Sequence, residues 1–260
     1  MTVLEICVDS MESAVAAERG GARRVELCSD LLEGGITPSP GLLEQVRKRV
    51  GIDVFVIIRP RGGDFFYTAE ELAIMRADIE HAKQLGANGV VLGILDMDGY
   101  VDVERTRELV EQAKPLPVTF HRAIDVSADF SDSLEKIIVT GARRVLTSGG
   151  RRRVVDSTRD ISQAIRQTQG RLIVMVGGGL NPENVATVAR ETGATEYHAS
   201  LNTGVPSPVR FRNDLLFLGA DLEREYMRYL VREEDVRALR DGLERANGQA
   251  RLPARWPPSQ

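Results

Sequence analysis

The two cysteines of the chain end two similar tripeptides, Glu5-Ile6-Cys7 and Glu26-Leu27-Cys28. Each tripeptide lies in a short apolar run that is typical of a β-strand, and the stretch between them is typical of a helix. Because side chains alternate along a strand, the glutamate and the cysteine of each tripeptide point to the same face. Neighbouring parallel strands would bring the two thiols together, which indicates either a soft-metal site or the reduced lining of a pocket.

Two of the three histidines, His121 and His198, lie near the ends of predicted strands, where parallel barrels place their active sites. Either histidine alone could equally be a hydrogen-bonded core residue. Assigning the polar strand faces inward gives a lumen that contains Glu5, Cys7, Glu26, Cys28, Arg59, Thr119, His121, Thr147, Glu196, His198 and Ser200. We expect Arg59 and the histidines to compensate the three glutamates, since buried charges must be paired. Glu26, His121 and His198 are candidate general acids or bases.

A glycine-rich loop with two arginines follows the third predicted strand. Arg59 and Arg61 offer planar forks for a carboxylate or a phosphate, and Asp64 can hold an arginine in place. The glycines between them allow a tight turn. The loop therefore predicts an anion clamp, or else an arginine–aspartate network that closes one end of the barrel.

Three consecutive glycines follow the seventh predicted strand. Gly177, Gly178 and Gly179 precede Asn181-Pro182, so free amides would lie at a helix start, a position at which barrels bind phosphate. The glycines could equally serve only to turn the chain. With Glu5 and the arginine loop, the predicted ligand-binding set also includes Thr147, Ser148 and Ser200.

Apolar β-branched runs alternate with helical segments from Val3 to about Ser200. The predicted strands are Val3–Val8, Arg24–Cys28, Val54–Arg59, Gly89–Leu95, Val118–Arg122, Arg144–Thr147, Leu172–Val176 and Glu196–Ser200. Eight βα units predict an α/β fold, a TIM-like (β/α)8 barrel in a single domain with a C-terminal helical appendage. We assign residues 1–205 to the barrel, 206–246 to the appendage packed on it, and 247–260 to a disordered tail.

Composition narrows the class of protein. The chain has 260 residues with 42% hydrophobic, which suits one barrel domain. A net charge of -4 and a pI near 5.6 argue against a nucleic-acid partner. The N-terminal stretch contains Glu5, Asp9 and Glu12, unlike a secretory signal, and no apolar run approaches membrane-spanning length. We therefore expect a cytoplasmic protein with reduced thiols, no membrane partner and no organic cofactor.

Several segments together resemble one known family. They are Leu4 to Ser10, Arg24 to Ser29, Ile58 to Phe65, Thr119 to Ala123 with Asp125, Val145 to Gly149, and Gly177 to Gly179. The chain is similar in these segments to the CutC copper homeostasis family. The resemblance implies a cytoplasmic, homo-oligomeric TIM-like barrel with a role in copper homeostasis. It also implies copper binding through Cys7 and Cys28, for which Cu(I) is the ion that thiolates select.

Two functions of different classes remain open. The first is a cytoplasmic copper homeostasis protein that binds Cu(I) through the two strand cysteines. The second is a lyase, isomerase or hydrolase that acts on a small anionic metabolite, with Glu26, His121 or His198 as acid or base. A third interpretation, a non-catalytic oligomeric scaffold, leaves the polar interior without a reason.

Overall fold

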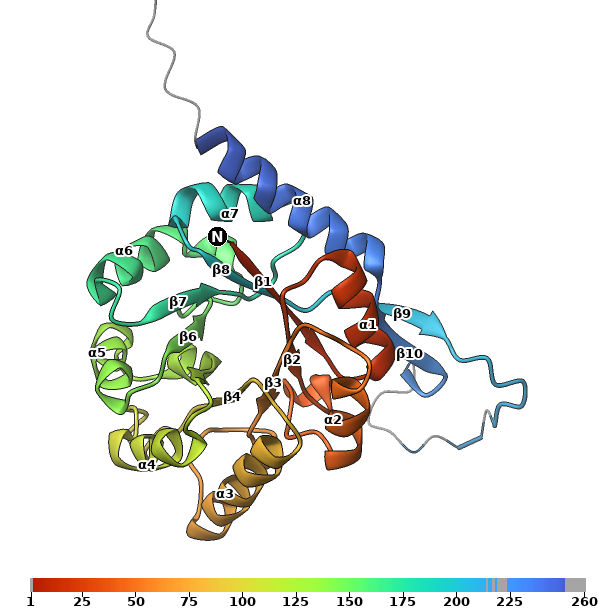
Figure 1. The fold of residues 1–260 in the computed structure, drawn as a ribbon, viewed down its shortest axis with the longest axis horizontal. Helices are drawn as coiled ribbons and strands as arrows, with labels where there is room; N and C mark the ends of the chain where they lie inside the picture. Colours follow the sequence, from red (N-terminus) through yellow and green to blue (C-terminus); the bar gives the residue numbers. More distant parts are fainter. Residues whose placement is uncertain (1, 214, 217, 219–223, 251–260) are drawn as a thin grey trace, which may run out of the picture.

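A computed structural model describes residues 2–213, 215–216, 218 and 224–250 of the 260-residue chain. Eight parallel strands pair in chain order and β8 pairs back with β1, so the sheet closes (Figure 1). The strands are β1 Val3–Val8, β2 Arg24–Leu27, β3 Asp53–Ile57, β4 Gly89–Leu92, β5 Val118–Phe120, β6 Arg144–Thr147, β7 Ile173–Val176 and β8 Glu196–Ala199. The predicted TIM-like (β/α)8 barrel is confirmed.

Seven helices follow the first seven strands and surround the barrel (Figure 1). They are α1 Met11–Gly20, α2 Pro40–Arg47, α3 Ala69–Gln84, α4 Val103–Ala113, α5 Phe130–Thr140, α6 Thr158–Thr168 and α7 Val185–Thr192. Thr68 and Glu71 form a reciprocal capping box at the start of α3. Short 3-10 turns η1 Leu31–Glu33, η2 Arg122–Val126 and η3 Val154–Asp156 lie in the loops after β2, β5 and β6.

One face of each strand packs against the helices and leaves the other face for the lumen. Ile6, Leu27, Phe120 and Tyr197 belong to the large apolar core between sheet and helices, and each is almost fully buried. Side chains of this size contribute roughly 2 kcal/mol each when they are buried. Because side chains alternate, the outward position of Ile6 directs Glu5 and Cys7 into the lumen.

A hairpin and a long helix follow the barrel. The strands β9 Asn202–Pro206 and β10 Met227–Val231 pair antiparallel, and α8 spans Glu233–Ala250 (Figure 1). The helix packs between α1 and α7, where a Cβ atom on Gly20 would lie 2.7 Å from Val236 Cγ1, so only glycine permits this approach. The predicted helical appendage is confirmed, whereas the hairpin was not predicted.

The predicted end of the appendage differs from the structure. The α8 helix continues to Ala250, past the predicted end at Ala246, so the predicted tail begins inside a helix. Its remaining part, 251–260, lies outside the described residues. Among the residues that the structure describes, no helix is both long enough and apolar enough to cross a membrane.

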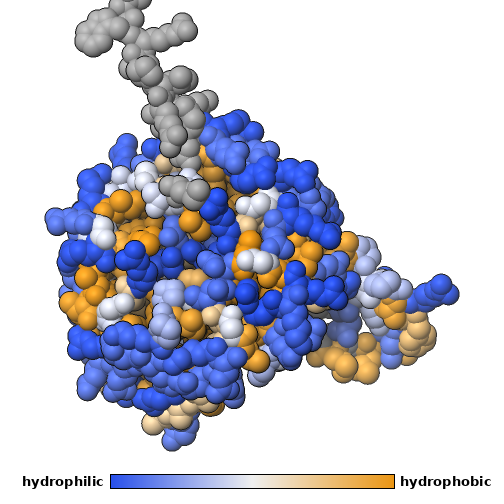
Figure 2. Space-filling view, viewed as in Figure 1, coloured by the Kyte–Doolittle hydropathy of each residue, from blue (hydrophilic) through white to orange (hydrophobic). Residues whose placement is uncertain are grey.

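The chain between β9 and β10 exposes large apolar side chains. Figure 2 shows apolar residues gathered on this projection, at the lower right of the view. Among the described residues of this segment, the exposed large apolar side chains are Val209, Phe211, Leu215, Leu216 and Leu218. A group of this kind is a feature of surfaces that contact another molecule.

Candidate functional site

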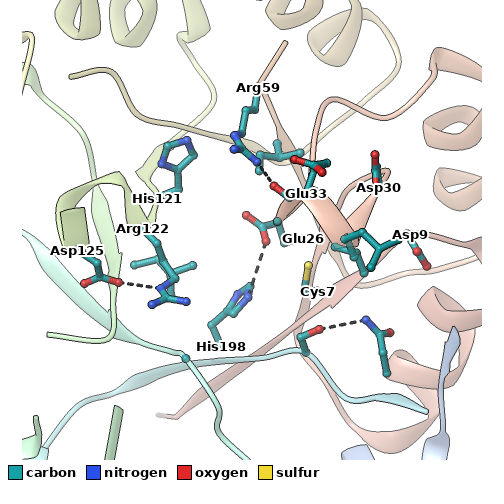
Figure 3. Close-up of a pocket in the computed structure, with 18 of the residues that line it drawn as sticks. Cys7, Asp9, Glu26, Asp30, Glu33, Arg59, His121, Arg122, Asp125 and His198 are labelled. Atoms are coloured by element: carbon teal, nitrogen blue, oxygen red, sulfur yellow. Dashed lines mark hydrogen bonds and ion pairs between the residues drawn. The ribbon is translucent and has the colours of Figure 1, made fainter. Parts of the chain in front are cut away.

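A cavity of about 840 Å³ lies where the strands end. Its lining comes from nearly every strand end: Cys7 from β1, Glu26 from β2, Ile57 and Arg59 from β3 and the loop after it, His121 after β5, Leu146 from β6, Gly178 and Gly179 after β7, and His198 from β8. The hairpin adds Asn202 and Tyr229. Figure 3 shows the side chains of Cys7, Glu26, Arg59, His121 and His198 converging from separate parts of the barrel. Parallel barrels place their ligand sites at this end.

The two thiols meet in the lumen, as predicted. Cys7 Sγ lies 3.5 Å from Cys28 Sγ, and neither cysteine is in a disulfide. Cys7 lines the cavity, whereas Cys28 is fully buried behind it against Phe55 and Ile57. Cys7 Sγ therefore faces the cavity, and Cys28 Sγ lies behind it among apolar side chains.

His198 joins the first thiol to two carboxyl groups. Its Nδ1 lies 2.7 Å from Glu5 Oε1, and its Nε2 lies 3.8 Å from Glu26 Oε2. One ligand atom each from Cys7, Glu26 and His198 lies within 4.8 Å of the other two, and all three residues are buried. The strand register causes this, since Glu5 pairs with His198 across β1 and β8, and Cys7 pairs with Glu26 across β1 and β2. Thiolate, imidazole and carboxylate on three strands form a possible metal-binding group.

Burial and hydrogen bonds shift the pKa values of Cys7, Cys28 and Glu26 in different directions. The hydrogen bond with Cys28, aided by His198, lowers the pKa of Cys7 to about 6. Its hydrogen bond to Cys7, together with burial, raises the pKa of Cys28 well above the ordinary value. Burial also raises the pKa of Glu26. Near neutral pH, Cys7 is therefore a thiolate and Cys28 holds its proton, while the Glu26 carboxyl group binds its proton more tightly than an ordinary carboxyl group does.

His198 is held in its charged form. Burial acts against the imidazolium, but hydrogen bonds to Cys7 and Glu5 and the nearby carboxyl charges outweigh it and raise the pKa of His198. The hydrogen bond from Nδ1 to Glu5 fixes the ring and turns Nε2 toward Glu26. The pair of Cys7 thiolate and His198 imidazolium is thus preorganised at the cavity floor.

A layer of charged side chains lies below this group. Arg24 pairs with Glu5 and, at 2.6 Å, with Glu196; Arg144 also pairs with Glu196 at 2.6 Å. Positive and negative groups therefore alternate from His198 through Glu5, Arg24 and Glu196 to Arg144. Both guanidinium groups also lie over the ring of Phe55. This layer neutralises carboxylates that could not otherwise be buried.

We predicted that Arg59 pairs with the lumen glutamates, and this prediction is wrong because loop carbonyl oxygens take its guanidinium. Its guanidinium donates to the carbonyl oxygens of Glu33 at 2.5 Å, Gly35 at 3.0 Å and Gly63 at 2.8 Å. Arg24 and Arg144 take the role instead, and sequence reasoning missed both. The signal for Arg24 was available, since it shares a strand face with Glu26 and Cys28.

The carboxylate of Asp125 is the centre of a second polar network at the cavity wall. It accepts hydrogen bonds from Thr147 Oγ1, from the amides of Ser148 and Gly150, and from Arg122 Nε at 2.7 Å. Arg122 Nη2 also donates to Ser148 Oγ at 2.7 Å. The predicted lumen position of Thr147 is wrong. Arg144 and Leu146 take the inward positions of β6, so alternation places Thr147 on the face of Val145, where its hydroxyl donates to Asp125.

Comparison with known proteins identifies the family. The model of the CutC family matches residues 2–203. The chain belongs to the CutC family. The copper homeostasis protein cutC homolog of Mus musculus is 48% identical over 238 residues, with 92% of this chain and 87% of the relative covered. That of Homo sapiens is 46% identical over 238 residues, with 92% and 86% covered.

A solved structure of another CutC protein agrees with the fold. The putative copper homeostasis protein CutC from Streptococcus agalactiae superposes with a TM-score of 0.73 at 33% identity, and the match covers 77% of this chain and 99% of that chain. The resemblance inferred from sequence is therefore confirmed.

The structure separates the predicted anion clamp of this CutC chain into two places. Arg59 lines the cavity, but Arg61 does not: it pairs with Glu71 at 2.6 Å and with Asp64 at 3.0 Å. Neither Arg61 nor Asp64 belongs to the cavity lining. The arginine–aspartate part of the alternative is present in the Arg61–Asp64 pair, whereas closure of one end of the barrel by it stays a prediction.

The glycine run is only partly available for a ligand. Gly178 and Gly179 line the cavity with Ser200, whereas the amide of Gly177 donates to Thr147 O at 3.0 Å. The helix predicted to start at Asn181 begins at Val185, because Asn181 Oδ1 accepts from the Glu183 and Asn184 amides and forms a turn. The glycine amides are therefore not at a helix N-terminus.

His121 lies apart from the thiol group although it lines the same cavity. Its Nδ1 accepts a hydrogen bond from the Ala123 amide at 3.2 Å, and its ring packs on Phe65. Burial and the charge of Arg59 lower the pKa of His121 to about 3. His121 is therefore neutral across the physiological range, unlike His198.

We expect the thiolate of Cys7 to form at an unusually low pH in the metal-free, reduced protein. Thiolate ultraviolet absorbance should show a transition near pH 6, below the ordinary value of 9.0, because the Cys28 thiol donates to the Cys7 sulfur. Cys28→Ala should move this transition upward, and Cys7→Ser should remove it. A transition that stays in place in Cys28→Ala would contradict this account of the thiol pair.

Proposed function

We propose that this chain is a cytoplasmic copper homeostasis protein that binds one Cu(I) ion through Cys7 and Cys28 in the barrel lumen. The observation that carries the proposal is the 3.5 Å contact between the two sulfur atoms at the cavity floor. Cu(I) is a soft ion, and thiolates are the ligands that select it over Mg²⁺ or Ca²⁺. The relatives named copper homeostasis protein support the assignment of the metal.

The surroundings of the thiols fit a monovalent cation. Cys7 is a thiolate near neutral pH, so it can accept Cu(I) without first losing a proton. Cys28 would release its proton on binding the ion. His198 and Glu26 lie within reach of the same point, and they could complete the coordination once His198 releases its proton. The apolar contacts of Cys28 with Phe55 and Ile57 keep water from that sulfur, which protects it from oxidation.

Cu(I) titration in competition with a chromophoric chelator tests the proposal. Reduced, metal-free protein under anaerobic conditions should take up one equivalent of Cu(I) and withdraw it from the chelator. Failure to compete, or uptake of several weakly held ions, would contradict a single thiolate site.

The cytoplasmic location and the homo-oligomeric state stay predictions. Exposed apolar side chains between β9 and β10 support association with another copy, and reduced thiols suit the cytoplasm. Sedimentation of the purified chain would measure the oligomeric state.

A second candidate function is favoured by the size of the cavity. A volume of about 840 Å³ lies within the range of roughly 300–1,000 Å³ for small-molecule sites and far exceeds the space of one ion. We propose as the alternative a lyase, isomerase or hydrolase in which His198, oriented by Glu5, donates a proton, while Glu26 exchanges one with the substrate. Mass spectrometry of natively purified protein should find a bound metabolite; a consistently empty cavity would count against this alternative.

A further inference from the structure

We propose that the cavity contains a subsite for the oxyanion group of a small-molecule ligand, a carboxylate or a phosphate, formed by Arg122, the Gly178 and Gly179 amides, Arg59 and His121. This subsite rests on the second candidate function, because it names the chemical class of that function's ligand. Its test measures anion binding alone, so the subsite can fail without affecting copper binding, and catalysis can fail while the subsite stands.

Arg122 is a fixed cation with a free edge. Its Nε donates to Asp125 Oδ2 and its Nη2 to Ser148 Oγ, both at 2.7 Å, and Nη1 has no hydrogen-bond partner among the described residues. Asp125 is itself held by backbone amides, so the guanidinium cannot turn freely. The side chain of Arg122 is 43% exposed and lines the cavity. A ligand oxyanion could therefore bind a preorganised guanidinium with little loss of entropy.

Two glycines of the cavity lining follow β7, and the first of them, Gly178, lies beside this guanidinium. Gly178 and Gly179 have φ values of +105° and +73°, which residues with side chains rarely adopt. A Cβ atom on Gly178 would lie 2.8 Å from Ser148 Cβ and 3.6 Å from Arg122 Cζ, so the backbone approaches the arginine closely. Neither amide donates a hydrogen bond to another described residue. Consecutive amides of this kind form a concave surface that binds anions.

Two buried donors of the cavity lining lack partners. Arg59 Nε and His121 Nε2 make no hydrogen bond among the described residues, and each residue is about 5% exposed. Since His121 Nδ1 accepts from the Ala123 amide, the ring proton resides on Nε2. A buried donor without a partner has lost its hydrogen bonds to water without gaining others. An acceptor-rich ligand would replace those hydrogen bonds, and burial keeps His121 neutral and able to donate, with its pKa at about 3.

The charges around the cavity orient such a ligand. Figure 3 shows His121 and Arg122 on one side and Asp9, Asp30 and Cys7 on the other. Arg224 also lines the cavity, but its charge acts on Asp9. Asp125 lies on the Arg122 side too, but it is paired with that guanidinium. An anionic group would therefore bind at the free edge of Arg122, away from Asp9 and Asp30, and the rest of the ligand would extend toward Cys7 and His198.

Calorimetric titration with inorganic phosphate and, separately, acetate tests the subsite in the full-length, reduced, metal-free protein. We expect saturable binding of at least one anion and a loss of about 10- to 100-fold in affinity in Arg122→Ala, the range for a charge-assisted hydrogen bond. Arg152→Ala, an exposed arginine outside the cavity lining, is the matched control and should bind like the parent. Tighter phosphate would indicate a phosphorylated ligand, and tighter acetate a carboxylate.

A positioning role for Asp125 gives a second readout. Asp125→Asn keeps the size of the side chain but weakens its hold on Arg122, so anion affinity should fall less than in Arg122→Ala. Arg122→Gln, with a thermal melt beside each titration, guards against a folding defect in the alanine variant. The proposal is overturned if neither anion binds, if folded Arg122 variants bind as tightly as the parent, or if Arg152→Ala loses as much.

Discussion

Replacing Cys7 with serine is expected to lower the affinity for Cu(I) by more than about 100-fold. Loss of groups that merely support a metal ligand commonly costs 10- to 100-fold, and Cys7 is proposed as a ligand itself. The serine hydroxyl is a hard, protonated donor that Cu(I) binds poorly. Cys28→Ser should have an effect of the same order, since the sulfur atoms lie 3.5 Å apart and both are proposed to contact the ion. Competition titrations with the chelator measure both variants.

Two further variants test whether the loss of Cu(I) affinity is specific to the thiols. Ser200→Ala changes another residue of the cavity lining without altering a proposed metal ligand, so its Cu(I) affinity should equal that of the parent. His198→Asn should fall between Ser200→Ala and the cysteine variants, because the ring is within reach of the ion but is not a thiolate. A Cys7→Ser, Cys28→Ser double variant that binds as tightly as the parent would end the copper proposal.

The second large effect concerns stability. Glu5→Gln is expected to lower the free energy of unfolding by about 3–5 kcal/mol, because it leaves the buried charges of Arg24 and His198 without their shared partner. Guanidinium denaturation measures the loss. Glu12→Gln is the matched control: Glu12 pairs with Arg228 at 2.7 Å, but both side chains are more than half exposed, so the change should cost less than about 1 kcal/mol.

The effect of Glu5 should depend on pH in a defined direction. Burial alone would raise the pKa of Glu5, but Arg24 and His198 outweigh it and lower the value from 4.5 to about 2. Its contribution, about 3 kcal/mol at 1.36 kcal/mol per pKa unit, is therefore fully present above pH 4.5 and is lost as the pH falls toward 2. The parent and Glu5→Gln should converge in stability over that range. A constant difference between them would contradict the assigned role.

Strand alternation was enough to predict the thiol contact. Cys7 and Cys28 follow glutamates at the same spacing, and the outward position of Ile6 and Leu27 fixes the inward position of both cysteines. The eight strands were also predictable, because each is a buried apolar run between helical segments.

Partners across the lumen were not predictable in the same way. Alternation places Arg24 inside, but its contact with Glu196 depends on how the strands are staggered around the closed barrel. Arg59 was misassigned because the loop that follows it supplies carbonyl oxygens to its guanidinium, and no strand pattern reports loop conformation. The hydrogen bonds that Asp125 accepts from the Ser148 and Gly150 amides also depend on loop conformation, so they were not predictable either.

The β9–β10 hairpin shows a further limit. The β9 sequence, Asn202-Thr203-Gly204-Val205-Pro206, contains glycine and proline and lacks the apolar alternation of a buried strand. Its pairing with β10 forms a mostly half-buried two-stranded sheet outside the barrel, so hydrophobic patterning gave no signal.

Anomalous diffraction at the copper edge from crystals of the Cu(I)-loaded, reduced protein is the most direct test of the copper site. We expect one strong anomalous peak in the barrel lumen, in contact with both Cys7 Sγ and Cys28 Sγ. A peak only at the protein surface, or a loaded crystal with no copper signal near these sulfur atoms, would contradict it.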